Sequence, residues 1–552
     1  MLMRNYDSDT SFSPRAVCTE PAYSGLSWAM LAKNETFGVG GKSEISLELV
    51  PVPLLHDPVS SSTYMSSPSE SRSLLHLEVD ESTQSAYGTS LDDNDDPEYI
   101  SRKVVERNLL RKLDFRTAYL VLIYILNQMD RNNAAAARLR GLEKDLGMKG
   151  TQFNTLISSL YIGYVFMQTP SNFILTRITK PSLYLSSCMS LWGLLTTLVG
   201  ISTSYYQALS SRFLVGFLEA TFYPGAVYLL SRWYRREELG YRTAFFTAGI
   251  GISNAFGSLL ASGILATMEG VLGYAAWRWL FFIEGYLTIL VGIGGMFILP
   301  DFPSSPASWL TPAEHNLAQK RMEEDSDGHG TADPTSSGGF AVVLSLMTDW
   351  RAWLIGTALC CCNASLSFNM FFPTLAATMG YSPTVSLLLC TPPWIMSTIT
   401  AVTVARHSDA TRERFGHMTF ALLMLITGYV LAMSTMNFTV RYISLFFMAQ
   451  AQVSNVILLT WISNTFARSS SKRAVAIGFM NCIGTSGNTL SPYIWPSSWG
   501  PTYTNSYLIC IVLAISCISL CWVFRRHLER LNEAAGEEER ELNLAKGYRY
   551  LL

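Results

Sequence analysis

The chain has 552 residues, of which 49% are hydrophobic and only 15% are charged, and its formal net charge at pH 7 is −2. Soluble proteins carry about 25% charged residues, so this composition excludes an ordinary water-facing surface. The near-neutral charge also argues against a nucleic-acid-binding protein. The ten cysteines show neither zinc-site spacing nor a secreted disulfide pattern, and we expect no metal and no cofactor.

The first segment, residues 1–112, is rich in Ser, Asp, Glu and Pro. Such a composition buries too little apolar surface to offset the entropy lost on ordering. We therefore expect a disordered cytoplasmic region. Its first residues lack the basic start and the apolar core of a signal peptide, so we expect the first spanning helix to direct membrane insertion.

Twelve apolar segments follow, each close to the roughly 20 residues that a helix needs to cross a bilayer. They lie near 117–136, 153–173, 183–202, 206–230, 243–267, 277–299, 350–372, 383–404, 416–435, 440–462, 474–495 and 504–524. The sequence thus predicts an all-α membrane protein with twelve transmembrane helices. They would form two six-helix bundles, at 113–300 and 349–526.

The polar segment 301–348 contains prolines and a Gly/Ser-rich patch and is typical of a linker between the bundles. Residues 527–552 form a charged tail. Basic residues recur in every second loop, which indicates that both termini, the linker and the tail are cytoplasmic. One predicted external loop departs from this rule, because it contains Arg138, Arg140, Lys144 and Lys149, partly offset by Glu143 and Asp145.

Small residues recur at every fourth position in two spans. They are Gly249, Ser253 and Gly257 in the fifth span and Gly478, Cys482 and Ser486 in the eleventh. This spacing lets two helix backbones approach closely. Because the two spans occupy matching places in the two bundles, the pattern indicates an internal repeat. Static packing and a rocking contact both need such a surface.

Charged residues inside the spans are candidates for function, because an ionised group at the bilayer centre costs at least about 2.5–3.5 kcal/mol. We assign Arg131 and Arg212 to binding an anion, and Asp130 and Glu219 to carrying a proton. Glu284, in the sixth span, is a further candidate. The alternatives are an interfacial ion pair at a helix end for Asp130 and Arg131, and a structural pair for Arg212 and Glu219.

Amide side chains in the seventh and tenth spans are candidates for the polar wall of a binding cavity. They are Asn363, Asn369, Gln450 and Asn455. Membrane helices also use such amides to hydrogen-bond to one another, so each is a weak signal alone. Asn437 starts an Asn-Phe-Thr sequence in a predicted external loop and is a candidate for N-glycosylation.

Several runs are distinctive, among them Met129–Asn133, Arg212–Ala220 and Trp277–Gly285. They resemble the fungal anion:cation symporters of the major facilitator superfamily, in the branch of the allantoate, nicotinate and pantothenate permeases, and the similarity covers roughly residues 100–540. The resemblance implies two six-helix bundles, alternating access and proton-coupled uptake of carboxylates. It also implies a cytoplasmic latch, formed by Asp409, Arg412 and Arg414.

The resulting hypothesis is a monomeric secondary active transporter in the cell membrane that carries a small organic anion together with a proton. One alternative is an efflux transporter for a small metabolite, including one from a fungal secondary-metabolite pathway. Another is a nutrient sensor that keeps the transporter fold. No phosphate-binding loop for ATP-driven transport and no nucleophile elbow is present in the sequence, and we expect no enzymatic activity.

Overall fold

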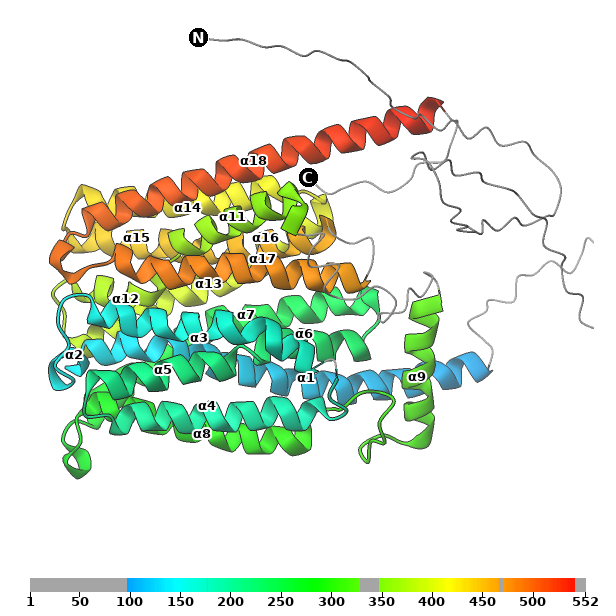
Figure 1. Ribbon diagram of the computed structural model, residues 1–552, viewed down its shortest axis with the longest axis horizontal. Coiled ribbons are helices and arrows are strands. Elements are labelled where there is room, and N and C mark those ends of the chain that lie inside the picture. The colour runs from blue at the N-terminus through cyan, green and yellow to red at the C-terminus, as the bar shows by residue number, and fades with distance from the viewer. Residues whose placement is uncertain (1–96, 176, 328–346, 466–469, 542–552) are drawn as a thin grey trace, which may run out of the picture. The chain divides into compact units, whose positions relative to one another are not determined.

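The computed structural model describes residues 97–175, 177–327, 347–465 and 470–541, and all regular structure in these ranges is helical. These residues belong to one compact unit that comprises 91–552. The predicted all-α fold class is therefore confirmed for the described part of the chain (Figure 1).

The first half contains α1 (Pro97–Arg138), α2 (Leu142–Asp145), α3 (Gln152–Leu175), α4 (Pro181–Ile201), α5 (Tyr205–Glu219), α6 (Phe222–Trp233), α7 (Arg236–Thr267), the 3-10 turn η2 (Val271–Gly273) and α8 (Ala276–Ile298). Within this half α4 packs along α8 and α3 packs along α5. The predicted fourth span is divided into α5 and α6. Pro224 explains the break, because it lacks the N–H that would continue the helical hydrogen bonds to Ala220.

The second half contains α11 (Trp350–Ser365), α12 (Phe368–Ala377), α13 (Pro383–Thr411), α14 (Phe415–Ser434), α15 (Phe438–Gln450), α16 (Gln452–Thr465), α17 (Ser470–Leu490), the 3-10 turns η3 (Ser491–Ile494) and η4 (Ser497–Trp499), and α18 (Thr504–Glu541). Here α11 packs on α17 and α18, and α14 packs on α15. The two halves meet where α7 packs on α13 and α3 packs on α17.

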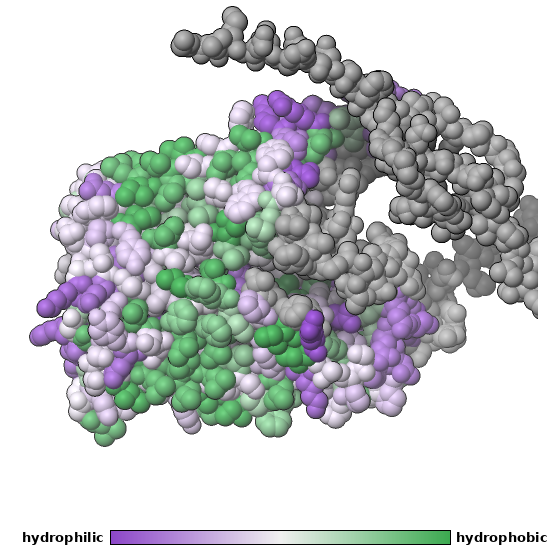
Figure 2. All heavy atoms as spheres, viewed as in Figure 1, coloured by the Kyte–Doolittle hydropathy of each residue, from purple (hydrophilic) through white to green (hydrophobic). Residues whose placement is uncertain are grey.

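Nine helical stretches in the described residues are long and apolar enough to cross a membrane. Helices α1, α3 and α17 cover the other three predicted spans and are not among the nine. Figure 2 shows a hydrophobic surface around the middle of the helical body, with hydrophilic residues toward its ends. The exposed apolar side chains include Leu191, Leu194, Phe297, Val512 and Ile515. A lipid-facing surface requires such a belt, and the twelve-span count stays a prediction.

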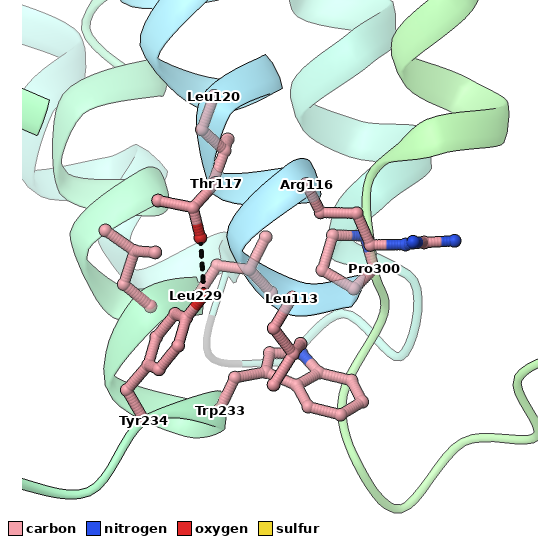
Figure 3. Close-up of a pocket in the computed structure, with 9 residues that line it drawn as sticks. Leu113, Arg116, Thr117, Leu120, Leu229, Trp233, Tyr234 and Pro300 are labelled. Atoms are coloured by element: carbon pink, nitrogen blue, oxygen red, sulfur yellow. Dashed lines mark hydrogen bonds between the residues drawn. The ribbon is translucent and has the colours of Figure 1, made fainter. Parts of the chain in front are cut away.

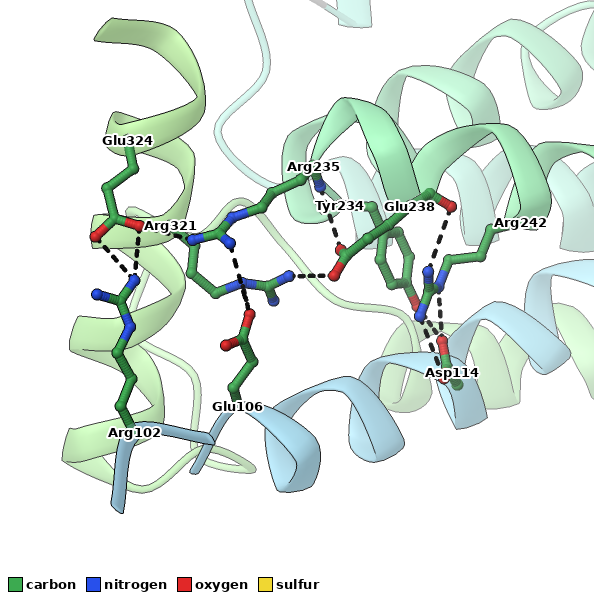
Figure 4. A network of polar contacts seen from close by, with 9 residues as sticks. All are labelled: Arg102, Glu106, Asp114, Tyr234, Arg235, Glu238, Arg242, Arg321 and Glu324. Atoms are coloured by element: carbon green, nitrogen blue, oxygen red, sulfur yellow. Dashed lines mark hydrogen bonds and ion pairs between the residues drawn. The ribbon is translucent and has the colours of Figure 1, made fainter. Parts of the chain in front are cut away.

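Helix α1 begins earlier than expected, because residues 97–112 are helical and not disordered as predicted. Helix α9 (Pro312–Asp327), in the linker, lies beside this extension. Arg321 of α9 is 2% exposed and pairs with Glu106 of α1 at 2.8 Å and with Glu238 of α7 at 2.6 Å (Figure 4). These pairs give the polar extension partners that its composition alone does not reveal.

The small-residue stripe of the fifth span packs against α1. The Ser253 hydroxyl donates to the Ile125 carbonyl at 2.8 Å, and a Cβ added to Gly257 would lie 3.3 Å from Met129. A Cβ added to Gly249 would meet Tyr124 at the same distance of 3.3 Å. This stripe therefore brings the two helices close enough for a backbone-directed hydrogen bond.

The corresponding stripe of the eleventh span behaves differently. A Cβ added to Gly478 would meet no atom within 4 Å, whereas one added to Gly487 would clash with the Cys360 backbone of α11. Ser486 lies next to the same residue, with its hydroxyl 3.5 Å from the Cys360 sulfur. Close approach of α17 to α11 thus depends on Gly487, which lies just outside the predicted four-residue repeat.

Candidate functional site

The five charged residues singled out in the first half lie together inside its bundle. Asp130 and Arg131 come from α1, Arg212 and Glu219 from α5, and Glu284 from α8. The three acidic residues are at most 1% exposed, and Arg212 is 3% exposed. We call these five residues the charged cluster.

Glycines explain how α5 reaches this position. A Cβ on Gly216 would clash with the Leu160 backbone of α3, and a Cβ on Gly163 would clash with the Phe213 backbone of α5. Because each helix presents a glycine to the other, α3 and α5 can pack backbone to backbone. This packing holds both charged residues of α5 toward the interior.

Arg131 and Glu219 form the one ion pair described between members of the charged cluster. Their Nε and Oε2 atoms are 2.8 Å apart, and the Glu219 side chain is fully buried while that of Arg131 is 14% exposed. The guanidinium carbon also lies 4.7 Å from the ring centroid of Tyr164. Arg131 is thus the most exposed member of the charged cluster.

Arg212 is held by a main-chain group. Its Nη1 donates to the Asp130 carbonyl oxygen at 2.8 Å, while its Nε and Nη2 have no hydrogen-bond partner among the described residues. Its guanidinium carbon lies 5.1 Å from the Phe281 ring centroid. Arg212 therefore keeps two buried donors for a further acceptor.

Five buried carboxylate oxygens of the charged cluster have no hydrogen-bond partner among the described residues: both of Asp130, both of Glu284, and Oε1 of Glu219. An unpaired buried polar group costs about 1–3 kcal/mol, and more if it is charged. The charged cluster contains three acidic side chains and two arginines, so it is neutral only when one acid holds a proton. Its composition alone therefore favours proton binding.

The amides of the second half are largely bonded to one another. Asn363 donates to the Gly484 carbonyl at 2.9 Å and accepts a hydrogen bond from Asn455. Asn369 donates to Gln452 at 3.0 Å. These bonds join α11 to α16 and α17, and α12 to α16, so they match the structural use of membrane amides.

Gln450 bonds within its own helix, whereas Asn369 lines a pocket. Gln450 donates to the Phe446 carbonyl of its own helix at 3.0 Å. Asn369 lines a pocket at the boundary between the halves, together with Asn132 and Asn133 of α1. The Asn369 side-chain oxygen is buried without a partner among the described residues, so this pocket offers an acceptor.

A second pocket lies at the other end of α1 and is a poor candidate for a binding site. Leu113, Leu229 and Trp233 provide an apolar wall, and Thr117 is hydrogen-bonded to Tyr234 at 2.8 Å (Figure 3). Arg116 also lines this pocket, but its guanidinium carbon lies 3.6 Å from the Trp309 ring centroid. Because the hydroxyls satisfy each other and Arg116 stacks on an aromatic ring, the pocket offers little for recognising a polar solute.

The predicted latch residues lie where α13 meets α14. Arg414 Nη2 is 2.6 Å from Asp409 Oδ1, and its Nη1 donates to the Ser408 hydroxyl at 3.0 Å. Arg412 ends α13 in the left-handed conformation, with φ of 55°. These contacts lie within the second half, and the latch role stays a prediction. Asn437 is an exposed N-cap of α15, and its glycosylation also stays a prediction.

Two residues around the charged cluster escaped the sequence interpretation. The Trp192 indole of α4 is fully buried, and its N–H interacts with Asp130 without the geometry of a full hydrogen bond. The Asn133 amide of α1 interacts likewise with Glu284. Trp192 sits in an apolar run where nothing marks it as functional, whereas Asn133 lies in the polar end of the first span and was visible there.

Comparisons with known proteins agree with this architecture. A family model described as Major Facilitator Superfamily matches residues 120–492. The MFS-type transporter cnsO of Penicillium expansum is 32% identical over 411 residues, which cover 72% of this chain and 78% of that protein. A protein of Agrobacterium vitis named "Putative tartrate transporter" is 30% identical over 422 residues, with coverage of 75% and 91%.

A solved structure shares the fold. It is described as a bacterial homolog to human lysosomal transporter, Spinster, in an inward-facing and unoccupied conformation. The similarity has a TM-score of 0.57 at 15% identity and covers 75% of this chain and 96% of that one.

Proposed function

The chain belongs to the major facilitator superfamily, and we propose that this multi-pass membrane transporter carries a small organic anion together with a proton. The observation that carries the proposal is the charged cluster, in which three acids face two arginines. Membrane proteins retain buried ionisable groups mainly where they bind substrates or move protons.

Arg131 is the proposed anion-binding residue. It is the most exposed member of the charged cluster and already binds one carboxylate, that of Glu219. A substrate carboxylate that replaced Glu219 would leave the acid buried without a partner. Glu219 would then take up a proton, because a lone buried carboxylate is costly. One proton would enter with each monoanion, and each unit of pH difference would supply about 1.4 kcal/mol.

Access is proposed to alternate about the contact between the halves. Ser158 donates to the Thr489 carbonyl at 2.8 Å and Tyr493 donates to Thr155 at 3.1 Å, both near the end that we assign as external from loop charge. In the proposed mechanism these bonds contribute to closing the external side. They would have to break for the charged cluster to be reached from outside.

The name of the Agrobacterium vitis relative supports an organic anion, because it mentions tartrate, a dicarboxylate. Export of a metabolite is the second candidate. The same fold serves both directions of transport, and the direction of net flux follows the gradients and not the fold. We place the protein in the cell membrane.

The test is uptake of labelled tartrate, nicotinate, pantothenate and allantoate by yeast that lacks its own organic-acid permeases. Uptake would be measured in acidic and in neutral buffer, with and without a protonophore. The variants are Arg131→Gln, Arg212→Ala and Glu219→Gln, and the control is Arg232→Ala, an exposed arginine of the same half. Each value is normalised to protein at the cell surface.

We expect acid-stimulated uptake that the protonophore abolishes. Arg131→Gln and Arg212→Ala should lose uptake, Glu219→Gln should lose its acid stimulation, and Arg232→Ala should behave as the unmodified protein. Absence of uptake of every compound despite surface expression would contradict import. Efflux of a metabolite from preloaded cells would then support export, the second candidate function.

A further inference from the structure

The basic residues at the end of α1 are unexplained by the charged cluster. Arg138 ends α1, and Arg140 follows it in the loop before α3. Loop charge places this loop outside the cell, where basic residues are normally scarce. The stretch 138–149 contains four basic and two acidic residues, so it forms a positive region at the external mouth.

The Arg138 side chain is largely buried and only partly paired. It is 9% exposed, and its Nε lies 3.1 Å from Glu143 Oε1. Its guanidinium carbon is 4.3 Å from the Phe153 ring centroid, while its Nη1 is buried with no hydrogen-bond partner among the described residues. Arg138 also interacts electrostatically with Tyr503 of the second half, so it lies at the boundary between the halves.

Arg140 reaches across the same boundary. Its Nη2 donates to the Thr384 hydroxyl at the start of α13, at 3.1 Å, and its Nε is buried without a partner among the described residues. The Thr384 carbonyl also accepts from Ser262 of α7 at 2.9 Å. Thr384 thus binds both Arg140 and Ser262, and it joins the start of α13 to the first half.

Both arginines therefore have a buried N–H group with no hydrogen-bond partner in the part of the chain that the structure describes. A guanidinium presents a planar set of donors that matches a carboxylate, and such charge-assisted hydrogen bonds are about twice as strong as neutral ones. The neutral hydroxyl of Thr384 is a weaker acceptor for Arg140 than a carboxylate would be.

We propose that Arg138 and Arg140 form an external binding site for the carboxylate of the substrate, separate from the charged cluster. A carboxylate that binds Arg140 competes with Thr384 for its donors, so binding weakens one contact that closes the external side. The site thereby couples capture of the anion to opening. This inference rests on the proposed function, because it takes the substrate to be an organic anion.

The first test measures how uptake depends on substrate concentration. The substrate is the one among tartrate, nicotinate, pantothenate and allantoate that the protein carries. Arg138→Gln and Arg140→Gln should each raise KM by about tenfold, the size expected for a lost charge-assisted bond, and leave maximal uptake nearly unchanged. Lys149→Gln removes one exposed charge from the same loop and is the matched control. It should leave KM unchanged.

Thr384→Val separates anion binding from simple closure. It removes the hydroxyl that Arg140 binds but keeps both arginines, so KM should stay the same or fall. A Thr384→Val variant that reproduces the defect of Arg140→Gln would overturn the proposal, because the arginine would then act only as a clamp. Unchanged KM in both arginine variants would overturn it as well.

A binding measurement keeps this test apart from the proposed function. Millimolar tartrate should raise the unfolding temperature of the purified protein. Part of the rise should persist in Arg131→Gln, and the double variant Arg138→Gln/Arg140→Gln should show a clearly smaller rise than the unmodified protein. If no carboxylate is transported but this pattern is seen, the proposed function fails and the external site stands. Equal behaviour of the unmodified protein and the double variant, including no rise in either, removes the site.

Discussion

Buried polar groups are treated differently in the two halves. In the first half, Arg212 has two donors without a partner among the described residues, and five carboxylate oxygens nearby are also unpaired. In the second half, Arg441 is 4% exposed, and its two terminal nitrogens donate to Thr378, Pro501 and Thr502. Arg212 thus makes one hydrogen bond and has two donors without a partner, whereas Arg441 is fixed by three acceptors and only its Nε has no partner among the described residues.

This contrast separates function from support. Buried polar groups in folded proteins are normally satisfied, so each exception calls for a specific explanation. In the second half, Asn363 and Asn455 bond to each other, and joining two helices is a sufficient explanation for this pair. The unpaired groups of the charged cluster are explained if a proton and an anion bind there during transport. The comparison therefore predicts that substitutions in the two halves will have different consequences.

The largest effect should come from the Arg131–Glu219 pair. Arg131→Gln leaves Glu219 buried and unpaired, which should cost about 3–5 kcal/mol of unfolding free energy. The double variant Arg131→Gln/Glu219→Gln should recover most of this loss, because neither side chain of the pair is then a buried, unpaired charge. Unfolding of the purified protein in detergent measures both. Additive losses in the double variant would show that the two side chains do not act as a pair.

A smaller effect is expected where α17 meets α11. Gly487→Ala places a methyl group against the Cys360 backbone and should cost about 1–3 kcal/mol through overpacking. Gly478→Ala is the matched control on the same helix, because its Cβ would meet no atom within 4 Å. It should be neutral or slightly stabilising. Equal thermal stability of the two variants would contradict the assignment of the close contact to Gly487.

Asn363→Ala tests the supporting role of the second half. It removes the bond to the Gly484 carbonyl and the acceptor of Asn455, at a cost of about 1–3 kcal/mol. We expect lower thermal stability but a KM within about twofold of the unmodified protein, measured in the same uptake assay. A large rise in KM with normal stability would place Asn363 in the substrate site and remove the contrast between the halves.

The smallest effect belongs to the surface pair of Arg102 and Glu324 (Figure 4). The hydrogen bond from Arg102 lowers the pKa of Glu324 below its ordinary value of 4.5. The pair therefore contributes stability at neutral pH that is lost as pH falls below that value. Because both side chains are 36% exposed, the contribution should be under about 1 kcal/mol. In Glu324→Gln the unfolding free energy should therefore fall less steeply at acidic pH than in the unmodified protein. An unchanged pH dependence would argue against the pair.

Much of the helix layout was predictable because apolar length and periodicity report directly on spanning helices. Each of the twelve predicted ranges is occupied by helix. The extension of α1 over residues 97–112 was not predictable, because Arg235 and Arg321, the partners of its Glu106, lie far away in the chain. The break at Ala220 was visible in principle from Pro224, a local signal that the span count did not use.

The sequence by itself determined which charged residues lie inside the membrane helices, because a charge in an apolar run is evident from composition alone. It did not determine how they pair. Asp130 and Arg131 are neighbours in sequence, yet Arg131 binds Glu219 of α5, and Arg212 binds the carbonyl of Asp130 and not a carboxylate. Adjacent helix positions point about 100° apart, so only the packing of α1 against α5 and α8 decides which side chains meet.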